Sequence, residues 1–279
     1  NPDALLIRSQ ILNENDFNKS LRCICRAGAG VNHIPLDMAT ERGVVVFNTP
    51  GGNANAVKEL VICGLLLSSR GIIQGHTFTQ GLDDKNSRDL TDLVETNKKR
   101  FKGSELNGKT IGIIGLGAIG SLLAQSVESM GMKIIGYDPN ISIDNAWQIP
   151  KEVEKADDLK YLLSNSDYVS LHVPLVDETK NLISKDSIKY MKKGSKLINL
   201  SRGAIVNNED VLSALENKKI SSFVTDFPTP ELVKRSKNFS DVILLPHLGA
   251  STKEAEINCA IMAAEQAESF LKDGEIINS

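Results

Sequence analysis

Short apolar runs alternate with stretches of helical periodicity along the chain. Strands are predicted for the apolar or β-branched runs at residues 4–7, 21–25 and 44–47, and helices for the stretches near 16–20 and 34–41. Residues 54–69 favour another helix, whereas the polar stretch 71–102 indicates no single element. The chain therefore begins as a small βα unit. Whether a further strand and helix precede this unit stays open.

From residue 110 the alternation becomes regular. Strand-like runs begin near residues 111, 133, 168, 196, 222 and 242, with helices or long connections between them. After residue 245 the spacing Ser251-x-x-Glu254 predicts a capping box, and Gly274 would close the helix that follows. The apolar stripe expected on this helix comprises Ile257, Ile261, Ala264, Ala267 and Leu271.

These patterns predict an α/β protein with two Rossmann- or flavodoxin-like, doubly wound parallel-sheet domains separated by a cleft. The last helix is too long to be only the end of the larger sheet, so we expect it to return to the first domain. The expected boundaries are residues 1–52, joined by 251–279, for one domain and 53–250 for the other.

A glycine-rich turn follows the strand-like run at 110–114. Gly115, Gly117 and Gly120 have the G-x-G-x-x-G spacing at the start of a predicted helix. In such a turn the first glycine permits the tight bend, the second lets a pyrophosphate approach the backbone, and the third lets helix and strand pack closely. The free N–H groups of the helix then face the phosphates.

The next predicted strand, 133–137, ends at Asp138, eighteen residues beyond Gly120. This is close to the spacing of about 20 residues at which an acid accepts hydrogen bonds from an adenosine ribose. Pro139 and Asn140 follow, so no adjacent Arg or Lys would neutralise a 2′-phosphate. Strand, turn, helix and acid together predict NAD, rather than NADP, as the cofactor.

Composition and charge limit the remaining classes of function and the expected location. With 279 residues, 41% hydrophobic and 24% charged, the chain is long enough for two cores. A net charge of −3 argues against nucleic acid as the main partner. No apolar run is long enough for a membrane span and no signal-peptide pattern is present, so the cytoplasm is the expected location.

The four cysteines, Cys23, Cys25, Cys63 and Cys259, indicate no metal site. Cys23-Ile24-Cys25 has no further ligands at suitable spacing nearby. Alternation along a strand explains the pair more simply. We therefore expect buried free thiols and no bound metal.

Two further signals lie at the ends of predicted strands, where ligands of doubly wound folds bind. One is the loop around Arg202, and the other runs from Asp226 to Glu231 and continues to His247. Oxidation of a hydroxy acid needs a base for the hydroxyl proton, an acidic partner for that base and a cation for the carboxylate. His247, Glu231 and Arg202 supply these three types. Each type alone is also common in an ordinary structural or surface role.

At this point the sequence strongly resembles the D-2-hydroxyacid dehydrogenase family, and within it the enzymes that act on 3-phospho-D-glycerate. The resemblance covers nearly the whole chain. The motifs that carry it are R-A-G-A-G-V at 26–31, F-N-T-P at 47–50, E-L-N-G-K at 105–109, the glycine turn, H-V-P at 172–174, S-R-G at 201–203 and P-H-L-G-A-S-T at 246–252.

The resemblance implies a role for each matched position. Arg202 would orient the substrate carboxylate and keto oxygen, His247 would be the acid/base, Glu231 would tune it, and Asp226 would hold the nicotinamide carboxamide. The implied cofactor-binding residues are Gly115, Gly117, Ala118, Ile119, Gly120, Asp138, His172, Val173, Pro174, Leu200, Ser201, Asp226, Gly249 and Ala250. The implied substrate-binding residues are Arg8, Ser9, Ala29, Gly30, Asn53 and Lys58. Lys58 is either a phosphate ligand or an exposed helix lysine, and the basic run 98–102 favours a solvated surface over phosphate contacts.

Three features depart from the family pattern. Phe227 directly follows Asp226 and Leu232 follows Glu231, although the spacing from Asp to Glu is kept. The segment before E-L-N-G-K lacks the Trp of many relatives, so contacts of the expected homodimer would differ in detail. The chain ends soon after the returning helix, which suggests a short form without the family's regulatory domain.

The leading hypothesis is NAD-dependent oxidation of 3-phospho-D-glycerate to 3-phosphohydroxypyruvate, the first step of phosphorylated L-serine biosynthesis. One alternative is reduction of hydroxypyruvate, glyoxylate or another 2-keto acid. A second is an NAD-sensing protein similar to C-terminal-binding corepressors. The complete Arg, Glu and His set favours an enzyme with a small-molecule partner.

Overall fold

The computed structural model describes residues 2–82 and 87–279, and the chain divides into two compact units. The first comprises Asn1–Val57 and Gly249–Ser279, so it is built from both ends of the chain, and the second is Lys58–Leu248. Residues 83–86, inside the polar stretch that sequence patterns left unassigned, lie outside the described part. No described helix is both long and apolar enough to cross a bilayer.

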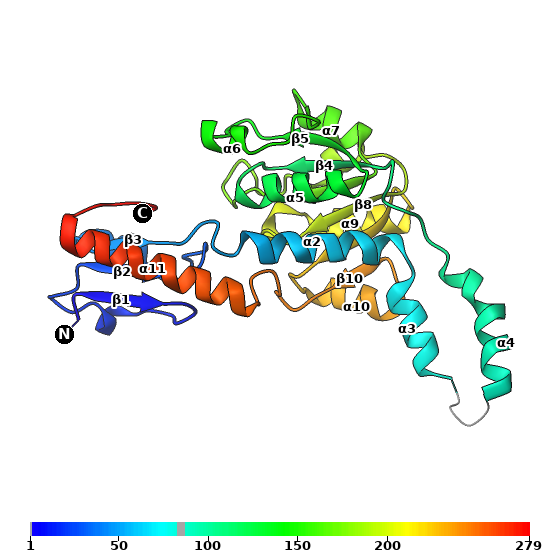
Figure 1. The fold of residues 1–279 in the computed structure, drawn as a ribbon, viewed down its shortest axis with the longest axis horizontal. Helices are drawn as coiled ribbons and strands as arrows, with labels where there is room; N and C mark the ends of the chain where they lie inside the picture. Colours follow the sequence, from blue (N-terminus) through cyan, green and yellow to red (C-terminus); the bar gives the residue numbers. More distant parts are fainter. Residues whose placement is uncertain (1, 83–86) are drawn as a thin grey trace. The chain divides into compact units, whose positions relative to one another are not determined.

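The first unit is organised around a three-stranded parallel sheet. Its strands are β1 (Ala4–Ile7), β2 (Cys23–Arg26) and β3 (Val45–Phe47), in the order β1-β2-β3. Alternation along β2 places Cys23 and Cys25 on one face and Ile24 on the other. Helix α11 (Lys253–Asp273) covers the cysteine face, alongside the sheet in Figure 1. Ile24 packs on the other face, in a cluster to which helix α1 (Leu36–Glu41) contributes Ala39.

The prediction of a helix near residues 16–20 is wrong. The structure has only a 3₁₀ turn, η1 (Glu14–Asp16), in which Asp16 Oδ2 accepts a hydrogen bond from Asn13 N at 2.8 Å. Asn18 Oδ1 then accepts from Ser20 N at 2.9 Å. Asn and Asp side chains that bond the nearby backbone in this way compete with helix formation.

Two expectations for α11 are also wrong. Thr252, and not Ser251, is the N-cap, because its hydroxyl accepts from Ala255 N at 3.1 Å. Ile257 and Ile261 of the expected stripe are exposed. The buried face is made of the small side chains of Ala255, Cys259, Ala263 and Ala267, of which Ala267 alone was in the expected stripe. Gly274 does end the helix, with φ of +75° in the left-handed region.

The second unit contains a seven-stranded parallel sheet in the order β10-β9-β8-β7-β4-β5-β6. Its strands are β4 (Thr110–Ile114), β5 (Lys133–Tyr137), β6 (Glu154–Lys155), β7 (Tyr168–Leu171), β8 (Ser195–Asn199), β9 (Ile220–Thr225) and β10 (Val242–Leu244). Counted from β4, the first six strands follow the 3-2-1-4-5-6 order of a Rossmann sheet. The predicted α/β class with doubly wound parallel sheets is confirmed. Only the two-residue strand β6 was not predicted.

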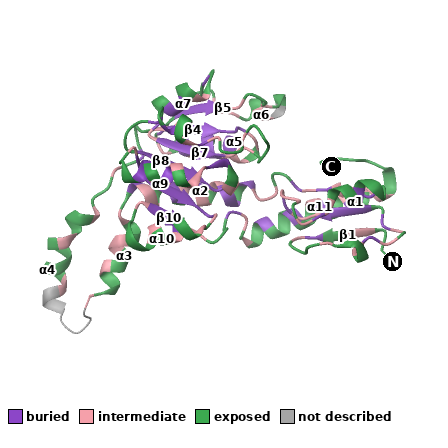
Figure 2. Ribbon diagram, turned by 180° about the vertical axis from the view of Figure 1, so that it is seen from behind, coloured by how far each residue is buried: buried purple, intermediate pink, exposed green. Residues whose placement is uncertain are grey.

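Helices cover both faces of this sheet. They are α2 (Ala54–Ser69), α5 (Ala118–Ser129), α6 (Ile143–Trp147), α7 (Leu159–Asn165), α8 (Lys185–Ile188), α9 (Asn208–Glu216) and α10 (Pro230–Asn238), with the 3₁₀ turn η3 (Gly203–Ile205). Figure 2 shows the strands mostly in the buried colour and the outer helices largely exposed. Ile111 and Ile113 are completely buried, as expected for strands covered on both sides.

The polar stretch 71–102 forms helix α3 (Ile72–Gln80), helix α4 (Ser87–Asn97) and the 3₁₀ turn η2 (Lys98–Phe101). The rings of Phe78 in α3 and Phe101 in η2 lie 5.4 Å apart. Four large apolar side chains of these two helices are exposed: Ile72, Ile73, Leu93 and Val94. These two helices therefore expose apolar side chains to solvent in a stretch whose polar sequence did not predict helices.

Candidate functional site

The glycine turn lies between β4 and α5. Gly115 has φ of +91°, and a Cβ there would lie 2.7 Å from the carbonyl carbon of His172. A Cβ on Gly120 would lie 2.0 Å from Gly115 O, so only glycine allows this approach of helix and turn. A Cβ on Gly117 would meet no atom within 4 Å, which leaves the backbone open to a ligand. Ala118 and Ile119 begin α5, whose first N–H groups have no intrahelical acceptor.

Asp138 follows β5 and is fixed to the glycine turn. Its Oδ2 accepts from Leu116 N at 2.8 Å, and its Oδ1 accepts from Asn140 N at 3.0 Å. Each carboxylate oxygen retains lone-pair capacity for another donor, such as a ribose hydroxyl. The bond from Leu116 orients the acid before any ligand binds. Sequence spacing predicted Asp138 but not its hydrogen bond from Leu116 N.

The loops after β7 and β8 are joined by a hydrogen bond. Ser201 Oγ donates to Val173 O at 2.6 Å. His172 is connected through Nε2 to Ser170 Oγ at 2.8 Å, and burial lowers its pKa to about 4. The ring is therefore neutral at physiological pH. Ser170, a buried strand residue, had not been singled out from sequence.

Two more of the expected cofactor residues belong to these loops. Pro174 O accepts from Thr179 Oγ1 at 2.6 Å, which fixes the chain just beyond His172. Leu200 is buried at the end of β8.

Arg202 lies at the carboxyl end of β8 and is half-buried. Its Nη1 donates to Ser201 O at 2.7 Å, and Asn199 Nδ2 donates to Arg202 O at 2.9 Å. Asn199 Oδ1 also accepts from Ser201 N at 3.2 Å. The buried Asn199 amide therefore holds both ends of this short loop. A buried amide at a strand end is the signal that would have identified it.

Phe227 connects three of the loops. Its ring lies 5.1 Å from the His247 ring in an edge-to-face arrangement, and a Cβ on Gly203 would approach Phe227 Cβ to 3.2 Å. The neighbouring residue Asp226 is 1% exposed, and its backbone O accepts from His247 N at 3.1 Å. The residue that departs from the family spacing thus packs between the Arg202 loop and His247.

His247 itself has an uncommon backbone conformation. Its φ is +46°, in the left-handed region that non-glycine residues seldom adopt. The side chain is exposed, with Phe227 against one side of the ring. Backbone strain of this kind is found most often at functional sites.

Glu231 is not joined to His247. It is exposed in the first turn of α10, which Thr229 caps by accepting from Leu232 N at 3.4 Å. Within residues 2–82 and 87–279 no hydrogen bond or ion pair connects the Glu231 carboxylate to the His247 ring. The structure therefore connects Arg202, Asp226 and His247 by backbone and ring contacts, and it shows no such contact for Glu231 among the described residues.

In the first unit, the expected substrate residues follow the carboxyl ends of the parallel strands. Arg8 and Ser9 follow β1, and Ala29 and Gly30 follow β2. Arg8 Nη1 pairs with Glu256 Oε1 of α11 at 2.6 Å, and Ala29 O accepts from Asn48 Nδ2 at 2.8 Å. Sequence reasoning did not identify Glu256 as the partner of Arg8.

Other expected residues lie around helix α2 and the returning segment. Asn53 precedes α2, and its backbone O accepts from Val57 N at 3.1 Å. The Lys58 side chain is only 16% exposed, with Nζ 3.9 Å from Glu59 Oε1, so it is not a solvated helix lysine. Gly249, which is buried, and Ala250 belong to the first unit.

The basic run and the cysteines have ordinary surroundings. Lys98 pairs with Glu95, and Arg100 Nη1 donates to Asn97 Oδ1 at 3.1 Å. The four cysteines are free thiols, but Cys63 is exposed, contrary to the expectation that all are buried. No group of three or more metal-ligating side chains is present among the described residues.

Comparison with known proteins gives this architecture a family. Residues 65–249, about two thirds of the chain, match the family model described as D-isomer specific 2-hydroxyacid dehydrogenase, NAD binding domain. The chain belongs to this family. The expected family and the expected cofactor, NAD, are both confirmed.

Relatives of this 2-hydroxyacid dehydrogenase include proteins with different names. It is 38% identical over 275 residues to D-3-phosphoglycerate dehydrogenase of Bacillus subtilis, covering 97% of this chain and 50% of the relative. It is 35% identical over 274 residues to hydroxypyruvate reductase of Thermotoga maritima, covering 95% of this chain and 83% of the relative. The chain thus spans about half the length of the phosphoglycerate dehydrogenase that it matches.

A solved structure shows the same fold. The NAD+-bound 3-phosphoglycerate dehydrogenase of Entamoeba histolytica aligns with a TM-score of 0.76 at 28% identity, covering 99% of this chain and 82% of that chain. In this 2-hydroxyacid dehydrogenase the open Gly117 backbone and the anchored Asp138 carboxylate fit the pyrophosphate and ribose of NAD.

Proposed function

We propose that this dehydrogenase oxidises 3-phospho-D-glycerate to 3-phosphohydroxypyruvate with NAD, the first step of phosphorylated L-serine biosynthesis. The supporting observation is the convergence of the Arg202, Asp226 and His247 loops at the carboxyl ends of β8 to β10, in a chain similar to a D-3-phosphoglycerate dehydrogenase. The carboxyl ends of the strands are where this fold class binds ligands.

The proposed chemistry divides between three side chains. NAD, when bound, supplies the acceptor for the hydride from C2 of the substrate. His247 takes the hydroxyl proton, because a neutral imidazole accepts a proton readily near neutral pH. Arg202 binds the carboxylate and the developing keto oxygen through its fixed guanidinium donors. Glu231 is proposed to stabilise the protonated imidazole.

The remaining assignments are part of the same proposal. Asp226 would hold the nicotinamide carboxamide, and Lys58 would bind the substrate phosphate as a largely buried ammonium group. The unit with residues 1–57 would be the substrate-binding domain, with Arg8, Ser9, Ala29, Gly30 and Asn53 as ligands, and the other unit would bind NAD. Free thiols accord with a proposed cytoplasmic location.

A second candidate is reduction of hydroxypyruvate, glyoxylate or a related 2-keto acid. The observation that favours it is the similarity to hydroxypyruvate reductase of Thermotoga maritima, of which this chain covers 83%. The two candidates use the same Arg202 and His247. They differ in whether a substrate phosphate contributes to transition-state binding.

Steady-state kinetics with matched substrates separate the candidates. We expect kcat/KM for 3-phospho-D-glycerate to exceed that for D-glycerate by at least about tenfold, because a phosphate bound by a buried cation contributes more than about 1.4 kcal/mol. The reverse reaction should likewise favour 3-phosphohydroxypyruvate over hydroxypyruvate. Equal values for the phosphorylated and plain substrates would instead establish the reductase.

A homodimer formed by the NAD-binding unit is also proposed. The apolar helix at 57–67 buries Val57, Val61 and Leu65 within the chain, although Leu66 is exposed. The dimer is supported better by the exposed side chains of Ile72, Ile73, Leu93 and Val94 on α3 and α4.

A further inference from the structure

A small polar hollow lies at the amino ends of β4, β7 and β8. Its volume is about 150 Å³, and it is lined by Ser104, Lys109, Asp167, Tyr168, Lys193, Gly194, Ser195 and Lys196. The glycine turn is at the opposite end of β4, a separation of about 15 Å for a five-residue strand that rises ~3.3 Å per residue. The hollow is therefore distinct from the proposed NAD site.

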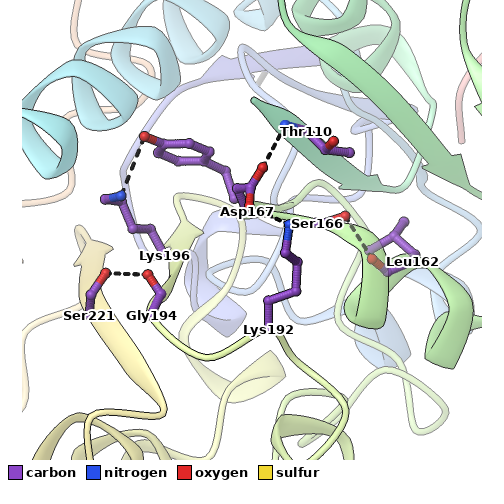
Figure 3. A network of polar contacts seen from close by, with 9 residues as sticks. Thr110, Leu162, Ser166, Asp167, Lys192, Gly194, Lys196 and Ser221 are labelled. Atoms are coloured by element: carbon purple, nitrogen blue, oxygen red, sulfur yellow. Dashed lines mark hydrogen bonds and ion pairs between the residues drawn. The ribbon is translucent and has the colours of Figure 1, made fainter. Parts of the chain in front are cut away.

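The one carboxylate in the wall is neutralised. Asp167 Oδ1 pairs with Lys192 Nζ at 2.5 Å, and Oδ2 accepts from Thr110 N at 2.9 Å, as Figure 3 shows. Burial tends to raise the pKa of Asp167, but the hydrogen bonds from Lys192 and Thr110 keep that pKa below its ordinary value. The carboxylate therefore remains ionised and occupied.

Three other ammonium groups surround the hollow, and of these Lys109 also acts electrostatically on Asp167. In the described part of the chain, Lys109, Lys193 and Lys196 make no ion pair. Lys193 is held at the rim by a turn in which Ser195 N donates to Lys192 O at 3.1 Å and Gly194 has φ of +80°. The hollow consequently has an excess of positive charge.

Lys196 is held by a hydrogen-bond chain through the neutral side chains of Tyr168 and Ser69. Its Nζ lies 3.4 Å from Tyr168 Oη and 4.6 Å from the centre of the Tyr168 ring. Ser69 Oγ donates to Leu65 O at 2.5 Å, so the 2.8 Å contact between Ser69 and Tyr168 has the tyrosine as donor. Tyr168 Oη is therefore left to accept from Lys196, whose other N–H donors remain available.

The Ser195 hydroxyl has no protein partner. Ser195 is 2% exposed, it lines the hollow, and its Oγ makes no hydrogen bond to any described residue. A buried hydroxyl without a partner destabilises the folded state. A ligand with acceptor oxygens in the hollow would remove this cost.

We propose that this hollow binds a small phosphate-class oxyanion, either inorganic phosphate or the phosphate of a monoester. Three ammonium groups and one unpaired hydroxyl form a donor set that suits a multiply charged oxyanion. The volume of about 150 Å³ is below the roughly 300–1,000 Å³ of drug-sized ligand sites, so it suits a small anion. The inference does not depend on which 2-hydroxy acid the enzyme oxidises.

Calorimetric titration of the full chain with inorganic phosphate at constant ionic strength tests the proposal. We expect saturable binding with Kd on the order of 1 mM or tighter. The double variant Lys109→Gln/Lys193→Gln should weaken it at least about tenfold, because both side chains are exposed cations at the rim. Lys234→Gln, an exposed lysine on α10, is the matched control and should bind like the wild type.

Two further variants locate the bound anion. Ser195→Ala should weaken phosphate binding severalfold. Arg202→Gln should leave it unchanged, because Arg202 lies at the carboxyl end of β8 and the hollow lies at the amino end. A parallel titration with methyl phosphate distinguishes a monoester from free phosphate, since tighter binding of the ester would indicate an organic ligand. Binding that is absent, that survives the double lysine variant, or that is lost in Arg202→Gln would overturn the proposal.

Discussion

At the scale of single residues, Asp138 shows how one backbone bond can prepare a cofactor site. Leu116 N holds Oδ2 of Asp138, so the carboxylate faces the glycine turn in the free protein. An oriented carboxylate accepts from both ribose hydroxyls of NAD and repels the 2′-phosphate of NADP. Asp138→Ala should reduce the NAD-over-NADP ratio of kcat/KM at least about tenfold. Asp177→Asn, at an exposed acid in the same unit, should leave the ratio unchanged. An unchanged ratio in Asp138→Ala would remove Asp138 from cofactor selection.

His172 should make the stability of the larger unit depend on pH. Burial lowers its pKa to about 4, against about 6.5 for an unfolded histidine. The folded state therefore binds fewer protons between these values, so the free energy of unfolding rises with pH across this window and is constant above it. The two pKa values set an upper limit of roughly 3–4 kcal/mol on this contribution to the free energy of unfolding.

Hydrogen exchange in β7 and β8 at roughly pH 5 and pH 8 measures this dependence. His172→Gln should flatten it, while His76→Gln, at an exposed histidine, should retain it. Burial also lowers the pKa of His33 in the other unit, but that contribution is common to all three proteins. A wild-type slope retained in His172→Gln would assign the effect to another group.

His247 and Glu231 should respond differently to substitution. His247→Asn is expected to lower kcat by about 10²–10⁴ with little change in NAD affinity, because the ring is proposed to supply the base and the glycine turn to hold the cofactor. Glu231→Gln should be milder and should move the acid limb of the oxidation profile to lower pH. Glu209→Gln is the matched control, at an exposed glutamate in the first turn of α9. An unmoved limb in Glu231→Gln would exclude the carboxylate from this role, and retained turnover in His247→Asn would refute the mechanism.

At the scale of secondary-structure elements, helix α11 is capped by Thr252 and not by Ser251, the cap that the sequence predicted. Thr252→Ala should destabilise the start of α11 by about 1 kcal/mol, because the threonine hydroxyl accepts from Ala255 N. Ser251→Ala should have little effect. Hydrogen exchange in the first turn of α11 measures both variants. Equal effects of the two substitutions would contradict the assigned cap.

The same helix shows why some elements could be predicted and others could not. The strands and the glycine turn were predicted correctly because β-branched runs and glycine spacing are local signals. The buried face of α11 was not, because close packing on β2 selects small residues such as Ala263 over the larger Ile257 and Ile261. Helices α3 and α4 were missed for the related reason that few of their side chains are buried.

The candidate site follows the same rule. Arg202, Asp226 and His247 could be proposed from motifs, since their residue types are tied to the chemistry. Asn199 and Phe227, which fix these loops, were not assigned roles, because their effect depends on neighbours that are distant in sequence. The anchor from Leu116 N to Asp138 is likewise a backbone contact, and backbone contacts leave little trace in residue identity.

At the scale of the whole molecule, the exposed apolar side chains of α3 and α4 predict self-association. Ile72, Ile73, Leu93 and Val94 are between 37% and 48% exposed, and burying them against a second copy would remove apolar surface from water. We expect sedimentation velocity at micromolar concentration to show a dimer. The double variant Leu93→Glu/Val94→Glu should dissociate it, because the interface would then contain unpaired charges.

The control for this prediction is Ile143→Glu. Ile143, on α6 of the same unit, is 76% exposed and thus a matched apolar surface position outside α3 and α4. It should leave the dimer intact. A wild-type monomer with full activity would refute the dimer, whereas dissociation by Ile143→Glu together with a stable Leu93→Glu/Val94→Glu dimer would transfer the interface from α3 and α4 to the face that carries α6.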